Sequence, residues 1–191
     1  MIRTLSEISA TCSKAVKAAG CPWGMAEEAG LAARRLASVG LPGAEAVADL
    51  LTTPRQCACA GQMAAQRCGL AEMVRLMDKP PRGSVELGEI ASPLLILGFA
   101  LVEQTCWEIR WPGGSAICAK VGLTLYGDLP GPLAAISIAP LDDGEPVYRP
   151  DWRSRHVDPT KWRILETYAA QLLVPETTRS RATGAGPDAT G

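Results

Sequence analysis

The sequence predicts an α+β fold, in which N-terminal helices pack with a small antiparallel sheet and a C-terminal helix. Three observations favour it. Residues 4–7 (Thr-Leu-Ser-Glu) have the form of a capping box, and apolar residues recur at helical spacing through residues 1–78. Short alternating segments separated by glycine-rich links occupy residues 84–148. Asp158 then precedes a proline and a last amphipathic helix over residues 159–174.

Four helices are expected in the N-terminal part, because each apolar repeat ends at residues that disfavour a helix. They lie between Thr4 and Gly20, from about Met25 to Val39 before Gly40, from Ala44 to Leu51, and from about Met63 to Met77. The second helix carries small residues along one side, so that a neighbouring backbone can approach it closely. These residues are Ala26, Ala29, Gly30, Ala33 and Ala37.

The middle of the chain predicts the sheet. Alternation at Val85 and Leu87 favours a strand, and Pro93 to Gln104 predicts a buried helix, with a central strand as the alternative. A hairpin is expected next, because Pro112-Gly113-Gly114 can reverse the chain. The predicted strands are Cys106 to Trp111, Ser115 to Tyr126, Leu133 to Ala139 and Val147 to Tyr148.

Composition limits the domain organisation and the classes of function. The 191 residues fit a single domain over residues 1–175, followed by a flexible tail over residues 176–191 that lacks apolar periodicity. Lys and Arg total 19 against 20 for Asp and Glu, so no global field attracts nucleic acid or a membrane surface. The longest apolar run is about half of the roughly 20 residues that a membrane span needs. No membrane association is expected.

Cysteine usage favours a reducing compartment. Seven cysteines are an odd number, spread over predicted helices and strands, and the polar N-terminus does not resemble a signal peptide. The expected localisation is therefore cytoplasmic. Cys57, Cys59 and Cys68 could supply three thiolates to a metal, but a fourth ligand is not evident, and neither a metal nor a cofactor is expected.

Basic residues in the C-terminal fifth suggest an anion site. His156 is the only histidine of the chain, and it follows Arg153 and Arg155 just before the last helix. Arginine side chains bind carboxylates and phosphates through paired N–H donors. The alternative interpretation of this segment is a solvated polar loop, and His156 is also a candidate base for one of the thiols.

Two segments resemble an uncharacterised, mainly proteobacterial domain-of-unknown-function family. They read Pro22-Trp23-Gly24-Met25-Ala26-Glu27-Glu28-Ala29-Gly30 with Ala32-Ala33-Arg34, and Val174-Pro175 with Ser180-Arg181 and Gly184-Ala185-Gly186. Members of that family look like stand-alone cytoplasmic proteins with an acidic continuation of the tail, from which this chain departs, and Thr178 stands where a carboxylate is usual. The resemblance implies candidate positions and no reaction.

These observations lead to a first hypothesis with named residues, in which a cytoplasmic protein binds a small anionic metabolite, either as a binding protein or as an enzyme. The expected binding residues are Trp23, Arg34, Arg153, Arg155, Ser180 and Arg181, and the candidate catalytic residues are Glu27, Glu28 and His156. In this hypothesis the tail closes over a pocket with walls of Trp23, Glu27 and Arg34, and the alternative is a solvated tail beside a tightly packed helix pair. The alternative is a non-catalytic subunit or accessory protein that docks on a larger metabolic enzyme. Nucleic-acid binding by the basic C-terminal fifth is a third hypothesis, which the net charge disfavours.

Overall fold

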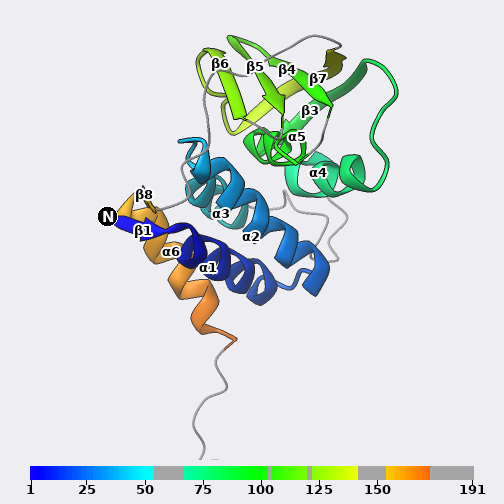
Figure 1. Ribbon diagram of the computed structural model, residues 1–191. Helices are drawn as coiled ribbons and strands as arrows, with labels where there is room; N and C mark the ends of the chain where they lie inside the picture. The colour runs from blue at the N-terminus through cyan, green and yellow to red at the C-terminus, as the bar shows by residue number, and fades with distance from the viewer. Residues whose placement is uncertain (54–66, 103–104, 120–121, 142–153, 173–191) are drawn as a thin grey trace, which may run out of the picture.

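The computed structural model describes residues 1–53, 67–102, 105–119, 122–141 and 154–172. Figure 1 shows two parts of the molecule, with helices α1, α2 and α6 on one side and a sheet on the other. The helices and the 3-10 turn η2 are α1 (Leu5–Ala18), α2 (Trp23–Ser38), α3 (Gly43–Thr52), α4 (Gly69–Asp78), η2 (Pro93–Ile96), α5 (Leu97–Ala100) and α6 (Pro159–Ala170). The strands are β1 (Ile2–Thr4), β2 (Arg67–Cys68), β3 (Val85–Ala91), β4 (Cys106–Trp111), β5 (Gly114–Ala119), β6 (Gly122–Gly127), β7 (Leu133–Leu141) and β8 (Ser154–His156). The α+β prediction is confirmed.

Helices α1, α2, α3 and α6 form one packed layer. The capping box that begins α1 is present, since Thr4 and Glu7 exchange hydrogen bonds in both directions. The ends of α1 and α2 are also as predicted, because Gly20 and Gly40 adopt left-handed backbone conformations just after them. The small residues of α2 let it approach α1 closely. A Cβ atom built at Gly30 would lie 2.5 Å from the carbonyl oxygen of Ser9.

Within the described residues the sheet has six strands in the order β2-β3-β7-β4-β5-β6. All neighbours are antiparallel except β2 and β3, so the sheet is mixed rather than purely antiparallel as predicted. Helices α4 and α5 lie between this sheet and the helical layer (Figure 1). Apolar residues from both parts form one continuous core, in which Phe99 of α5 contacts Trp107 of β4 at 5.4 Å between ring centroids.

Three predicted boundaries are wrong for identifiable reasons. The fourth helix begins at Gly69 and not near Met63, because the two residues before Gly69 pair with the end of β3. The buried helix expected from Pro93 to Gln104 is instead η2 followed by one turn of α5, and residues 103–104 lie outside the described residues. The strand expected from Ser115 to Tyr126 is two strands, β5 and β6, which pair with each other.

The last described segment, β8 and α6, packs against the other elements of the helical layer. Strand β8 pairs with β1, so His156 lies in a strand opposite Ile2 rather than in the polar loop of the alternative interpretation. Asp158 caps α6 as predicted. The predicted strand at Val147 to Tyr148 and the predicted tail over residues 176–191 lie outside the described residues. None of the helices in the described ranges combines the length and the apolar character that crossing a membrane requires.

The cap of α6 is expected to make stability depend on pH. The backbone N–H groups of Lys161 and Thr160 donate to the Asp158 carboxylate at 3.0 and 2.7 Å and lower its pKa. A lowered pKa in the folded state stabilises the protein above the unfolded value of about 3.9, and this contribution is lost as the pH falls through the folded value. Asp158→Ala should therefore lower Tm at neutral pH, by a difference that shrinks below about pH 4 in thermal scans.

Asp158→Asn is the control for this prediction, because asparagine keeps the capping oxygen but has no charge. This variant should retain more of the stability than Asp158→Ala at neutral pH. A Tm difference between the wild-type protein and Asp158→Ala that stays constant from neutral pH down to about pH 2.5 would contradict the assignment.

Candidate functional site

The candidate residues on α2 differ in exposure and in their contacts. Trp23 is 57% exposed, and the ammonium of Lys17 lies 5.3 Å from its ring centroid. Glu27 is exposed and Arg34 is half-buried on the same helix. The tail that is predicted to cover a pocket beside this helix, with Ser180 and Arg181, lies outside the described residues, so the pocket itself stays a prediction.

Glu28 has a structural partner rather than a substrate-facing position. Its Oε2 atom lies 3.9 Å from Nη1 of Arg35, and both atoms are buried without a hydrogen bond. Burial lowers the pKa of Arg35, whereas the neighbouring charge of Glu28 raises it. The pair links two turns of α2, and this position does not favour Glu28 as a general acid or base.

Arg155 stabilises the end of α2. Its guanidinium donates to the carbonyl oxygens of Ala37 and, at 2.9 Å, of Ser38. A cation placed at the C-terminal carbonyls of a helix is favourable. Arg155 also lines a small cavity of about 110 Å³ together with His156 and Glu45, beside the first residues of α3. The structure thus brings two predicted site residues together, while Arg153 lies outside the described residues.

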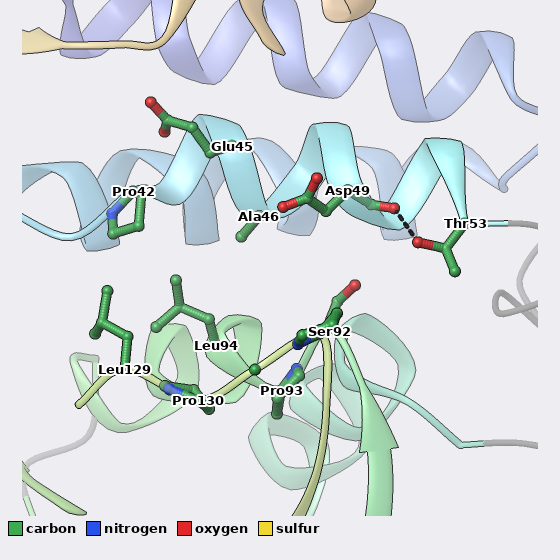
Figure 2. Close-up of a pocket in the computed structure, with 12 residues that line it drawn as sticks. Pro42, Glu45, Ala46, Asp49, Thr53, Ser92, Pro93, Leu94, Leu129 and Pro130 are labelled. Atoms are coloured by element: carbon green, nitrogen blue, oxygen red, sulfur yellow. Dashed lines mark hydrogen bonds between the residues drawn. The ribbon is translucent and has the colours of Figure 1, made fainter. Parts of the chain in front are cut away.

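A larger cavity of about 370 Å³ lies on the other side of α3 and was not predicted from the sequence. We call it the α3 cavity. One wall is α3, and the opposite wall is formed by η2 and the loop between β6 and β7 (Figure 2). Its lining residues are Pro42, Glu45, Ala46, Asp49, Thr53, Ser92, Pro93, Leu94, Leu129, Pro130, Gly131 and Pro132.

The α3 wall carries the charge of the cavity. Asp49 forms an ion pair with Lys161 of α6, and its backbone carbonyl accepts a hydrogen bond of 2.7 Å from the Thr53 hydroxyl. Glu45 stands one turn earlier and accepts a hydrogen bond of 2.8 Å from the backbone N–H of Asp158. In Figure 2 the Glu45 carboxylate points away from Leu129 and the rest of the opposite wall. Asp49 is therefore the better placed of the two carboxylates to meet a ligand.

The side chains of the opposite wall are apolar, with Ser92 as the polar exception among its described residues. This residue has a left-handed backbone conformation, with φ 52° and ψ 52°, which costs on the order of 1 kcal/mol in a residue other than glycine. Its backbone N–H donates to the carbonyl of Pro132 at 2.9 Å. Ser92 as a whole residue is only 7% exposed, and its hydroxyl makes no hydrogen bond with any described residue. The hydroxyl oxygen borders the cavity and is not itself fully buried, so a ligand in the cavity can reach it.

The five described cysteines, Cys12, Cys21, Cys68, Cys106 and Cys118, are all buried. Burial raises the pKa of the Cys12 and Cys118 thiols far above the ordinary range for cysteine, which disfavours the reactive thiolate. The described residues also contain no group of three His, Cys, Asp or Glu side chains placed to hold a metal ion. The predicted thiolates of Cys57 and Cys59 lie outside them.

Thiol labelling tests this description. In the native protein Cys12 and Cys118 should react with iodoacetamide on the order of a hundredfold more slowly than in denaturant, because the thiolate is the reactive form. Site-resolved mass spectrometry after timed labelling measures both rates in one sample. Equal rates of Cys12 or Cys118 in native and denatured protein would show that the thiol is accessible and activated, contrary to its burial.

Comparison with known proteins finds a family match for one part of this chain. Residues 3–78 match the family described as "Protein of unknown function (DUF3726)". The resemblance to a family of unknown function is confirmed over this range, which includes α1, α2, α4 and the α3 wall of the cavity. No curated protein and no solved structure matches the chain. The wall formed by residues 92–94 and 129–132 lies outside the matched range.

Proposed function

We propose that this chain is a cytoplasmic protein that binds a small molecule in the α3 cavity. The observation that carries the proposal is a hollow of about 370 Å³ whose two walls come from separate parts of the chain and differ in chemistry. Ligand sites are concave and mostly apolar, with a few polar groups that orient the ligand, and volumes of roughly 300 Å³ or more are typical. Three buried free thiols, those of Cys12, Cys106 and Cys118, support the reducing compartment.

An anionic ligand is the second candidate, and it belongs to the smaller cavity. Arg155 and His156 border that cavity, next to the first backbone N–H groups of α3, and helix N-termini favour anions. Glu45 also borders it, however, and Arg155 is already hydrogen bonded to α2. Anion binding by Arg34, Arg153, Arg155, Ser180 and Arg181 stays a prediction.

A protein partner is the alternative from a different class. Strand β6 is an edge of the six-stranded sheet as described, and it exposes Leu125 and Tyr126, with Leu129 just beyond it. Exposed apolar side chains near a strand edge favour docking of another chain. An accessory role is tested by pull-down from lysate together with size-exclusion chromatography and light scattering. A stable monomer at micromolar concentration with no partner recovered from lysate would count against this alternative.

Ligand-observed NMR with a fragment library tests binding in the α3 cavity. Fragments that give saturation transfer with the wild-type protein should lose most of the signal with Ala46→Leu, because Figure 2 places Ala46 on the α3 wall facing the cavity. Tyr126→Leu, an exposed position on β6, is the control and should bind normally. Circular dichroism verifies that both variants fold.

Two results would overturn the proposal. One is the absence of any fragment that binds to the folded wild-type protein. The other is a set of fragments whose signals are the same with Ala46→Leu and with the control variant, since these would occupy another surface. If Ala46→Leu does not fold, Leu94→Trp fills the same cavity from the opposite wall and replaces it.

A further inference from the structure

We infer that the ligand of the α3 cavity is a small organic cation, with an ammonium group on a compact apolar body. This inference rests on the proposed function and concerns the chemistry of the same site. Four observations carry it: the position of Asp49, its bond to a lysine of the same chain, the lining of the opposite wall, and the free hydroxyl of Ser92.

The Asp49 carboxylate already binds an ammonium group. Lys161 of α6 reaches it from outside the cavity lining, and the two side chains are 36% and 43% exposed. Ion pairs that are this exposed contribute little to stability, since water competes for both groups. A ligand ammonium can therefore replace that of Lys161, or share the carboxylate with it, at a small cost in stability.

The charges around the cavity favour a cation over an anion. Glu45 and Asp49 both line it, and no lysine, arginine or histidine is among its described lining residues. The charged groups near this part of α3 are Lys161 of α6, the cap residue Asp158 and, beside Glu45 in the smaller cavity, Arg155 of β8. These five groups carry three negative and two positive charges, and neither cation is part of the described lining of the α3 cavity. A cation meets a site of net negative charge.

The opposite wall suits an apolar body of limited size. Pro93, Pro130 and Pro132 present rigid rings, and Leu94 and Leu129 fill the space beside them. This wall contains no aromatic ring, so it cannot attract the cation itself through a π face. It can bury the hydrocarbon part of the ligand while the carboxylate wall holds the charge.

Ser92 supplies a second polar contact. An ammonium carries three N–H donors and no acceptor, so a single carboxylate does not satisfy it. The Ser92 hydroxyl lines the same cavity without a hydrogen bond among the described residues, and in Figure 2 it stands on the wall that faces Asp49 and Thr53. Its lone pairs can accept one of the remaining ammonium hydrogens.

Isothermal titration with three probes of the same shape tests the inference. Cyclohexylmethylamine, cyclohexylmethanol and cyclohexanecarboxylate share a ring and differ in charge. The amine should bind the wild-type protein about tenfold more tightly than the alcohol, and the carboxylate should bind more weakly than both. Asp49→Asn should reduce the preference for amine over alcohol to within about twofold while leaving alcohol binding unchanged.

Lys161→Gln provides an independent variant whose effect has the opposite sign. Removing the internal ammonium frees Asp49, so amine affinity should rise several-fold while alcohol affinity stays the same. This variant keeps the prediction testable if Asp49→Asn does not fold. Glu86→Gln removes an exposed carboxylate from β3 and raises the net charge by one, as Asp49→Asn does, so it is the charge control for Asp49→Asn and should change the affinity for neither the amine nor the alcohol.

The outcomes separate this inference from the proposed function. Binding of the alcohol or the carboxylate as tight as that of the amine, or an unchanged amine affinity in both variants, would overturn the cation inference while the cavity remained a binding site. Failure of all three probes to bind, together with a fragment screen that found nothing, would overturn the proposed function itself. A preference for amine that Lys161→Gln increases and Asp49→Asn removes would support both.

Discussion

Replacing Gly43 with alanine is expected to lower the free energy of unfolding by about 3 kcal/mol. Gly43 is the first residue of α3, and a Cβ atom there would lie 2.3 Å from the carbonyl oxygen of Ala33 in α2. Backbone atoms of Ala33 surround this position, so no side chain can rotate away to relieve the clash. Helix α3 would have to move as a unit, which would also change the wall of the α3 cavity.

Gly24→Ala is the matched control for this prediction. Gly24 lies in α2 with no atom within 4 Å of the position of an added Cβ. Alanine should stabilise the protein there by about 0.5 kcal/mol, because glycine costs conformational entropy in a helix. Urea denaturation followed by circular dichroism measures both variants. A loss of less than about 1 kcal/mol for Gly43→Ala would show that the contact between α2 and α3 is looser than the structure indicates.

Truncating Phe99 to alanine is expected to cost about 4 kcal/mol, since large buried aromatic side chains lose packing and leave a cavity. Phe99 is the only phenylalanine of the chain and is fully buried in α5. It contacts Trp107 of β4 with an interplanar angle of 51°, so it joins the helical part to the sheet. The loss should therefore weaken both parts together.

Chemical denaturation monitored by tryptophan fluorescence and by far-ultraviolet circular dichroism measures this effect with two probes. Leu125→Ala, an exposed position on β6, is the control and should change the free energy of unfolding by less than about 0.5 kcal/mol. If Phe99→Ala unfolds in two separate transitions, the helices and the sheet are independent units. A single transition at lower denaturant is the expected result.

Local sequence patterns account for the helices well. The capping box at Thr4 and the aspartate cap at Asp158 bind backbone groups within three residues of the capping side chain. The sequence alone therefore predicts both caps. Gly20 and Gly40 likewise end helices through their own backbone conformation. Such signals do not depend on the rest of the chain.

The sheet was harder to predict because its strands are specified by distant partners. Arg67 and Cys68 become a strand only through pairing with Ile90 and Ala91. The apolar run after Pro93 is long enough for a helix or a strand, and burial on every side removes the periodicity that would distinguish them. Tertiary packing turned this run into η2 and a single turn of helix.

The α3 cavity as a whole could not be predicted from the sequence, because only one of its walls has a local pattern. The α3 wall has a pattern in the sequence: Glu45 and Asp49 are four residues apart and therefore share one face of a helix. Its opposite wall comes from Ser92 and from prolines about forty residues further along, and no local pattern relates them to α3. The arginines were predicted as binding residues only because of their charge. In the structure Arg155 donates to a carbonyl oxygen at the end of α2 and stabilises that end.

The pairing of β8 with β1 and the packing of α6 have a consequence for synthesis on the ribosome. The bond from Arg155 to α2 spans 118 positions of the chain, and the bond from Tyr168 to Leu51 of α3 spans 117. As the nascent polypeptide emerges, the faces of α1 and α3 that α6 will cover have no cover until almost the whole described chain has been translated. The stretch that matches the family, residues 3–78, is thus made before α6 and waits for α6 to complete the burial of its helices.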